Sequence, residues 1–382
     1  MSYRIEKMKD APLKFIDGDR SSKYPKRNEF QSEGIMFLNA NSISSGIFDI
    51  SAVNYISQEK YETITKGRIV PNDIILTTRG NGVGDSFLFK EKYGEGLINA
   101  QMLIIRCDEK MLSPQYLYYF FTNPACKNYF INCSSGSAQP QLPIKSLKEI
   151  EIKYPPLPTQ RRIASILSAY DDLIENNLKR IKLLEEKAFL RYKGIVRNEK
   201  MEELTIEDLA NVVMGQSPIS DTFTDEKNDI PFHQGVTNFT NYFVEHKIYC
   251  NSPIKIAEAG DILFSVRAPV GRINFTTDKI CIGRGLCAFR NKKGFQNFFY
   301  HQLKEFFFTE DVIGNGAIFN AVTKLELMKV KFKTPSEKIQ LEFENEAKVI
   351  YNLILNLTMQ NAKLMEARDI LLPRLMNGEI EV

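Results

Sequence analysis

Residues with the types and spacing of a catalytic site are few in this chain. Glu151 and Lys153 have the Glu-x-Lys spacing of many metal-dependent nucleases, in which the glutamate holds Mg²⁺ and the lysine stabilises developing negative charge. A corresponding later stretch, residues 331–333, reads Lys-Phe-Lys and lacks the carboxylate. We therefore favour a structural strand, and a duplicated nuclease stays open as the enzyme alternative. Cutting of DNA by the purified chain with Mg²⁺ alone would support that alternative.

Other catalytic and cofactor signatures are missing from the sequence. It has no Walker A lysine motif, no strand–GxGxxG–helix unit, no methyltransferase tetrad and no GxSxG elbow. Tyr154-Pro155-Pro156-Leu157 lacks the Asn or Asp of that tetrad and indicates a strand-to-helix break. Six cysteines form no CxxC pair and three histidines form no HExxH, which predicts core thiols in a reducing compartment. We expect no metal and no cofactor.

Two turns that follow predicted strands display arginine, which suits bidentate contacts to guanine or to phosphate. Arg79 begins RGNGVG and Arg267 begins RAPVGR. Later loops in both halves carry small and amide side chains that suit hydrogen bonds to base edges. Each turn or loop alone is also explained as ordinary polar surface. The residues predicted to face DNA are Arg79, Asn81, Ser137 and Gln139 in the first half and Arg267, Arg272, Asn315 and Asn320 in the second.

Charge gives a weaker indication of a nucleic-acid partner. The net charge is only +3, from 50 basic and 47 acidic residues, with about +7 through residue 200 and −4 after it. A basic loop near the N-terminus is the better candidate for phosphate contacts, and a solvated surface explains it equally well. The loop contains Arg20, Lys23, Lys26 and Arg27.

An internal repeat indicates which elements position these residues. A shift of 180 residues aligns Pro155 with Pro335, and a shift of about 188 aligns Asp73 with Asp261 and Arg79 with Arg267. Short β-rich runs between Gly, Asn and Pro clusters predict a mixed sheet in each half. Aromatic stretches predict helices packed on that sheet, and core packing explains them better than base stacking. These stretches are residues 116–121 and 298–308.

Two stretches of 3.5-residue periodicity predict long helices that pair along an apolar seam. If paired positions sum to 538, the helices are antiparallel, Asn177 faces Asn361, and Tyr170 faces Arg368. The seam residues are Ile163, Leu167, Tyr170, Ile174, Asn177, Ile181 and Leu184 in the first helix and Phe343, Ile350, Ile354, Leu357, Asn361, Leu364 and Arg368 in the second.

The expected fold class is α+β, with two globular mixed α/β domains joined by an antiparallel pair of long coiled-coil helices and related by a pseudo-twofold internal repeat. The predicted boundaries are 1–155 for the first domain, 156–200 for the first spacer helix, 201–335 for the second domain, and 336–382 for the second helix and C-terminal tail. No apolar run approaches the ~18 to 20 residues of a membrane span, so we expect a soluble, cytoplasmic protein without membrane contact.

These motifs resemble a known family. The helical stretches 154–189 (YPPLPTQRRIASIL…) and 371–382 (LLPRLMNGEIEV) are similar to the specificity (S) subunit of type I restriction-modification systems. Its target recognition domains resemble IDGDRSSKYPKRNEF (16–30), GQSPIS (215–220), RAPVGRINF (267–275) and CIGRGLCAFR (281–290). Thr159 departs from the pattern, since the family often has an acidic residue there.

The resemblance implies a non-catalytic DNA-recognition subunit. Each target recognition domain would read one half of a bipartite double-stranded DNA target, and the helices would set the spacing and dock two methyltransferase (modification) subunits. Restriction/translocase subunits would complete the nuclease complex. A protein-binding scaffold without DNA contact is the other alternative, and it would show no DNA-induced shift even with methyltransferase partners. Candidate docking positions beside the seam are Arg180, Glu185, Lys363 and Glu366.

Overall fold

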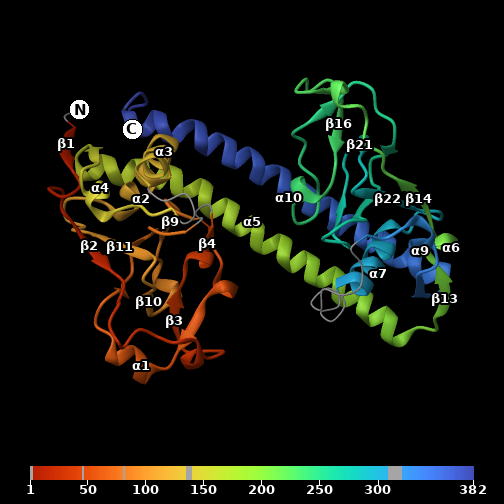
Figure 1. Cartoon of the computed structure of the whole chain (residues 1–382), viewed down its shortest axis with the longest axis horizontal. Helices are drawn as coiled ribbons and strands as arrows, with labels where there is room; N and C mark the ends of the chain where they lie inside the picture. The colour runs from red at the N-terminus through yellow and green to blue at the C-terminus, as the bar shows by residue number, and fades with distance from the viewer. Residues whose placement is uncertain (1–2, 45–46, 81, 135–139, 309–320) are drawn as a thin grey trace. The chain divides into compact units, whose positions relative to one another are not determined.

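The computed structural model describes residues 3–44, 47–80, 82–134, 140–308 and 321–382 (Figure 1). The chain divides into two compact units. The first unit comprises Met1–Glu175 and Asn361–Val382, and the second comprises Asn176–Gln360. Each unit therefore contains one segment of each long helix in addition to its sheets. The domain boundaries expected from the sequence treat the helices as separate parts, and they stay a prediction.

The first unit contains an antiparallel sheet, a mixed sheet and a two-stranded ribbon. The antiparallel sheet has the order β2 (Leu13–Asp17), β11 (Met102–Cys107), β8 (Ile74–Thr77), β9 (Ser86–Leu88). The mixed sheet has the order β6 (Asn54–Ile56), β3 (Ile35–Leu38), β10 (Gly96–Ile98), β7 (Arg68–Ile69), with β3 and β10 parallel. The remaining elements are β1 (Arg4–Lys7) paired with β12 (Glu151–Tyr154), β4 (Ile43–Ser44) paired with β5 (Ile47–Phe48), and the helices α1 (Gln58–Thr63), α2 (Pro114–Thr122), α3 (Pro124–Cys133) and α4 (Ile144–Lys148).

The second unit repeats this plan. Its antiparallel sheet has the order β14 (Ala210–Met214), β22 (Leu286–Asn291), β19 (Ile262–Ser265), β20 (Ile273–Phe275). Its mixed sheet has the order β15 (Phe223–Thr224), β17 (Tyr249–Cys250), β16 (Ile230–His233), β21 (Ile280–Ile282), β18 (Ile256–Ala257), and β16 and β21 run parallel side by side (Figure 1). The remaining elements are β13 (Glu202–Thr205) paired with β23 (Lys331–Thr334), and α6 (Ile206–Leu209), α7 (Gln296–Phe308) and α9 (Lys324–Met328).

The aligned aspartates show that the repeat is structural. Asp73 is buried before β8, and Arg106 donates to both of its carboxylate oxygens at 2.7 and 2.8 Å. Asp261 is buried before β19, and Arg290 binds it in the same way at 2.7 and 2.8 Å. Two bonds with matched fork geometry satisfy a carboxylate that would otherwise be costly to bury. The predicted duplication and the predicted mixed sheets are confirmed.

The aromatic stretches fill the core, as the sequence indicates. Ser113 caps α2, and Pro114 takes the first helical position, where a missing N–H costs nothing. Tyr116, Phe121 and Phe130 are buried in one cluster with strand residues and with both long helices. In the second unit, Phe298 and Phe299 of α7 occupy the corresponding cluster.

The two long helices are α5 (Leu157–Asn198) and α10 (Glu337–Asn377), and their segments run antiparallel within each unit. In the first unit, Arg368 of α10 binds Asp171 of α5 at 2.7 Å. In the second, Arg191 binds Glu346 at 3.0 Å. Both pairs lie within one residue of the predicted register. The antiparallel pair and the α+β fold class are confirmed.

The seam positions are buried or half-buried along both helices. Polar Asn177 and Asn361 are both buried, with exposed fractions of 6% and 5%. Arg368 was expected opposite Tyr170 and instead pairs with the neighbouring Asp171, because a half-buried guanidinium is stabilised more by a carboxylate than by a ring.

Glycine is required at one equivalent turn of each unit. Gly84 and Gly271 have φ of +89° and +92°, and a Cβ added there would lie 3.2 Å from Phe130 and 3.3 Å from Phe307. We expect Gly84→Ala and Gly271→Ala each to lower the free energy of unfolding by about 1 to 2 kcal/mol, measured by urea denaturation. Gly294→Ala is the matched control, since Gly294 has φ of +80° and open space around it. An equal loss in Gly271→Ala and Gly294→Ala would mean that Phe307 contributes nothing.

Candidate nucleic-acid interface

Three segments of the first unit meet at one end of the antiparallel sheet. The segment after β2 carries Arg20, the turn after β8 carries Arg79, and residues 99–101 join β10 to β11. Thr78 donates its backbone N–H and its hydroxyl to the carbonyl of Gln101 at 2.8 and 3.0 Å. Arg20 donates to the carbonyl of Ala100 at 3.4 Å and to Asp17 at 3.2 Å. The predicted arginines of the first half therefore belong to segments that meet at this end of the sheet.

The same end of the sheet in the second unit gathers the segments that follow β14, β16 and β19 around residues 283–285. Val266 donates its N–H to the carbonyl of Gly285 at 2.9 Å, and Gly283 donates to the carbonyl of His233 at 2.8 Å. A Cβ added to Gly215 would lie only 2.1 Å from the carbonyl oxygen of Gly283. Glycine at position 215 therefore allows its backbone to contact that of Gly283. Such close approach of backbones is also found where a sheet end faces a ligand.

Arg79 and Arg267 occupy equivalent positions at these ends. Arg79 forms an isolated antiparallel bridge with Gln141, and Arg267 forms one with Ala321. Arg79 is half-buried and Arg267 is exposed. Gly84 donates its N–H to the carbonyl of Thr77 at 3.0 Å, which returns the chain to the end of β8.

Arg272 is exposed, and its counterpart in the first unit is an aspartate. Ser265 donates its N–H to the carbonyl of Arg272, just as Thr77 donates to the carbonyl of Asp85, both at 2.9 Å. The two units thus present opposite charges at one equivalent place. The predicted residues Asn81, Ser137, Gln139, Asn315 and Asn320 lie outside the described residues.

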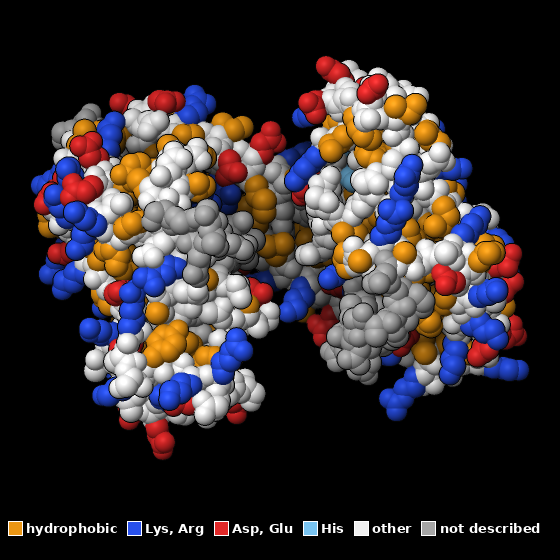
Figure 2. Space-filling model, in the orientation of Figure 1, with side chains coloured by type: hydrophobic (Ala, Val, Ile, Leu, Met, Phe, Trp, Pro, Cys, Tyr) orange, Lys and Arg blue, Asp and Glu red, His pale blue; other side chains and the backbone are white. Residues whose placement is uncertain are grey.

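The basic loop of the first unit is held by packing that leaves its cations outside. Tyr24 packs edge-on against Phe37 with ring centroids 5.5 Å apart, and Pro25 is buried. Lys60 binds Glu29 at 2.7 Å, and this hydrogen bond lowers the pKa of Glu29. The exposed cations are Arg20, Lys23, Lys26 and Arg27. Figure 2 shows lysines and arginines spread over the visible face of each unit with acidic side chains among them, as the small net charge implies.

Comparison with known proteins identifies the family. The model of the type I restriction modification DNA specificity domain matches residues 16–186 and 198–361. The chain belongs to this family. The putative type I restriction enzyme MjaX specificity subunit of Methanocaldococcus jannaschii is 30% identical over 373 residues, which cover 91% of this chain and 88% of that protein. The HindI specificity subunit of Haemophilus influenzae is 21% identical over 456 residues, covering 95% and 98%.

A solved structure has the same fold. The type I restriction-modification S subunit from M. genitalium has a TM-score of 0.64 with 16% identity, covering 98% of this chain and 96% of that one. The resemblance found in the sequence is confirmed: this chain is a specificity subunit, the non-catalytic DNA-recognition component of a type I restriction-modification system. It acts with DNA and with other subunits of such a system.

The specificity subunit has polar groups at this interface that the sequence analysis did not single out. Ser217 donates its hydroxyl to Gln234 Oε1 at 2.7 Å, and Arg284 donates its backbone N–H to Ser217 Oγ at 3.4 Å. Gln234 and Arg284 are exposed. A signal that could have found two of them is glycine beside polar residues, in Gly215-Gln216-Ser217 and Gly283-Arg284-Gly285.

The nuclease alternative has no support from the arrangement around Glu151. Glu151 and Lys153 are both exposed on β12, which pairs with β1 as a simple ribbon. Lys153 lies over the ring of Tyr3 and donates to the carbonyl of Asn377 at 3.4 Å. Within the described ranges, no cluster of three His, Cys, Asp or Glu residues is arranged to hold a metal ion. The part of the chain that is described also contains no helix long and apolar enough to cross a membrane.

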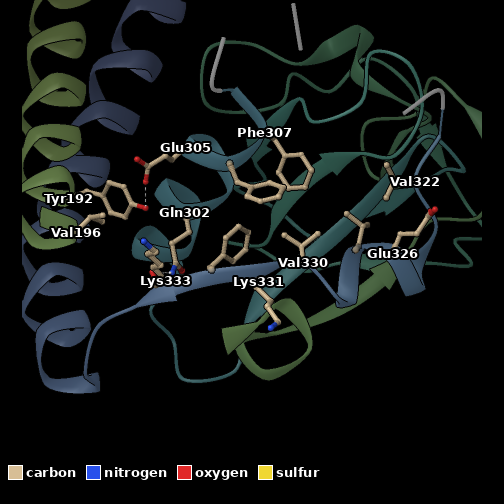
Figure 3. Close-up of a pocket in the computed structure, with 13 residues that line it drawn as sticks. Tyr192, Val196, Gln302, Glu305, Phe307, Val322, Glu326, Val330, Lys331 and Lys333 are labelled. Carbon is tan, nitrogen blue, oxygen red and sulfur yellow. Dashed lines mark hydrogen bonds between the residues drawn. The ribbon is translucent and has the colours of Figure 1, made fainter. Parts of the chain in front are cut away.

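A pocket of about 660 Å³ lies in the second unit, lined by residues of α5, α7, α9 and β23 and by Val322. Its walls are largely aromatic and aliphatic, and Figure 3 shows Tyr192 of α5 bonded to Glu305 of α7 at its edge, at 2.7 Å. Burial raises the pKa of Tyr192 above its ordinary value, so its hydroxyl stays protonated and donates. The lining therefore offers mainly apolar packing surface.

All three histidines lie in the second unit. Two of them, His233 and His246, lie next to the loop of residues 283–285, because Gly283 donates its N–H to the His233 carbonyl. His233 Nε2 lies 2.9 Å from His246 Nδ1, and His246 Nε2 lies 3.2 Å from Asp278. Burial, together with the neighbouring His246, lowers the pKa of His233 to about 4. Burial and Lys304 lower the pKa of His301 to about 3. Both rings are therefore neutral at pH 7.

Proposed function

We propose that each unit of the specificity subunit reads one half of a bipartite target in double-stranded DNA. Residues 1–155 and 201–335 act as the target recognition domains. Residues 156–200 and 336–382 act as spacer helices, the second with a C-terminal tail, and they set the separation of the two half-sites. The two matched DNA specificity domains, one after the other in the chain, support this division of the target.

One observation carries the proposal: Arg79 and Arg267 each follow an equivalent strand by two residues and bridge to equivalent segments in the two units. A guanidinium at the same place in each unit gives two similar readers, and different neighbours give them different base preferences. The exposed Arg20, Lys23, Lys26 and Arg27 bind phosphates, which positions the first unit without reading sequence.

Two methyltransferase (modification) subunits dock on the helices, and restriction/translocase subunits join the complete assembly. A repeated surface accepts two identical partners in equivalent poses. Arg180, Lys363 and Glu366 are exposed and suit this role. Glu185 does not, contrary to expectation, because it is half-buried and paired with Lys304 inside its own unit.

The test is to map the DNA motif methylated by the specificity subunit with its modification partner, and to measure the mass of the purified complex. We expect a bipartite motif and two modification subunits per chain. Arg79→Ala and Arg267→Ala should each relax one position in a different half-site, by about 1 to 3 kcal/mol of discrimination. The chain alone should bind DNA poorly, because a net charge of +3 releases few counterions.

A single bound modification subunit, or tight specific binding by the chain alone, would overturn the proposed assembly. Relaxation of both half-sites by Arg79→Ala would overturn the division between units. Cutting by the chain with Mg²⁺ alone would favour the nuclease alternative, and no DNA-induced shift with the partners present would favour the scaffold. Lys279→Ala is a control, since Lys279 is an exposed cation that precedes β21, at the opposite end of that strand from the interface.

A further inference from the structure

We propose that Arg284 and Gln234 form a hydrogen-bond donor surface that reads a guanine in the half-site bound by the second unit. The inference rests on the proposed function and adds to it a base and two residues. It begins from the loop of residues 283–285, which lies between β21 and β22 at the end of the antiparallel sheet.

The backbone around this loop is packed so closely that Arg284 is its outward side chain. A Cβ added to Gly283 would lie 2.3 Å from Gln234 Oε1, and one added to Gly285 would lie 2.5 Å from the carbonyl oxygen of Gln234. Gly285 also donates its N–H to that carbonyl at 3.1 Å. Arg284, between the two glycines, is exposed. The loop therefore holds a guanidinium on a fixed backbone beside Gln234.

The hydrogen bonds of Ser217 fix which way the Gln234 amide faces. Arg284 N–H donates to Ser217 Oγ at 3.4 Å, so the serine proton is free to be donated onward to Gln234 Oε1, at 2.7 Å. With its oxygen used in this way, Gln234 presents its NH₂ group to a ligand. Among the described residues the Arg284 side chain forms no ion pair, so its guanidinium donors are also available.

A surface made of donors selects among the base edges of the major groove. Guanine offers two acceptors there, O6 and N7, while cytosine offers a donor and adenine one of each. Arginine binds the guanine pair through two parallel N–H bonds, and a glutamine NH₂ beside it adds a third donor at the edge. The same donors would also suit a phosphate, so the experiment must separate base from backbone contacts.

The first unit lacks this arrangement, which confines the inference to one half-site. Its equivalent loop reads Asn99-Ala100-Gln101 and has no charged residue. The guanidinium nearest to that loop comes from Arg20, which contacts the Ala100 carbonyl but also binds Asp17. An arginine already paired with a carboxylate has fewer donors left for a base.

The experiment compares methylation motifs of complexes containing Arg284→Ala, Arg284→Lys or Gln234→Ala with those of the unsubstituted complex and of Lys279→Ala. We expect Arg284→Ala to relax one guanine position about 5- to 150-fold, in the half-site that Arg79→Ala leaves intact. Arg284→Lys should relax it as well, because lysine keeps the charge and loses the fork. Gln234→Ala should weaken discrimination at the same or the adjacent position. Equal thermal unfolding of the variants checks their folding.

Three results would overturn the inference: no guanine in that half-site, an unchanged motif in Arg284→Ala, or a uniform loss of methylation that Arg284→Lys restores. The last result would assign Arg284 to a phosphate. Failure of the proposed function looks different, since the unsubstituted complex would then methylate no bipartite motif. A bipartite motif with unaltered specificity in Arg284→Ala would reject only the guanine contact.

Discussion

Inserting four residues into each long helix is expected to lengthen the gap between the two recognised half-sites and to leave their bases unchanged. Four helical residues add about 6 Å, roughly two base-pair steps of duplex DNA. Ile181 and Leu357 are suitable insertion points, because both are buried in one cluster of the second unit near the predicted register. Mapping of the methylated motif measures the gap directly.

The reason for this expectation is that the residues proposed to read bases and the helices proposed to set the spacing are different elements. Arg79, Arg267 and Arg284 belong to loops at sheet ends, and none of them lies on α5 or α10. A seven-residue insertion at the same points is the matched control, since it preserves the 3.5-residue seam and should give a better folded protein with a still longer gap. Altered half-site bases in either variant would show that the helices take part in base reading.

Acid is expected to destabilise the second unit before the first. His233 and His301 have folded pKa values of about 4 and about 3, below the ordinary 6.5, because burial disfavours the charged ring. The unfolded chain therefore binds more protons as pH falls from 6.5 towards 4, and stability falls with it. At pH 5 the loss is about 2 kcal/mol for each histidine. The first unit contains no histidine and escapes this loss.

Hydrogen exchange of the whole chain between pH 7 and pH 5 resolves the two units, and intrinsic exchange rates are corrected for pH. His301→Gln keeps a donor near the Tyr351 hydroxyl, which lies 3.0 Å from His301 Nε2, and should flatten the pH dependence of the second unit. His233→Gln should also flatten this pH dependence, and the glutamine would keep a hydrogen-bonding group near His246. Glu344, whose pKa burial raises, acts in the opposite direction below pH 5 and reduces the net loss. Parallel loss of protection in both units would contradict the prediction.

The sequence predicts the fold of this molecule well, and it predicts the candidate DNA-contacting residues only in part. Asp73 and Asp261 align in the sequence because each is a buried carboxylate that needs an arginine partner, and this requirement restricts the residue type at both positions. The seam is predicted for the same reason, since its burial imposes a period.

The hydrogen bond between Ser217 and Gln234 joins residues 17 apart in the chain, and no periodic sequence pattern predicts it. The exchange of Arg272 for Asp85 at one equivalent position is also invisible without the fold, because the turn lengths differ between the halves. The candidate reading residues lie on irregular segments whose contacts depend on which strands are neighbours, and tertiary packing determines that order.

Gln160, in the first turn of α5, gives the helix a further mechanical role. Its buried amide accepts the N–H of Ser113 at 2.8 Å and donates to the carbonyls of Met111 and Pro155 at 3.2 and 2.8 Å. These three hydrogen bonds fix the orientation of the start of α5 relative to the rest of the first unit. A single residue added to α5 beyond Glu175 would turn that body by about 100° around the helix axis. If the arginines read DNA as proposed, such an insertion tests whether the rotation about α5, as well as its length, matters for recognition.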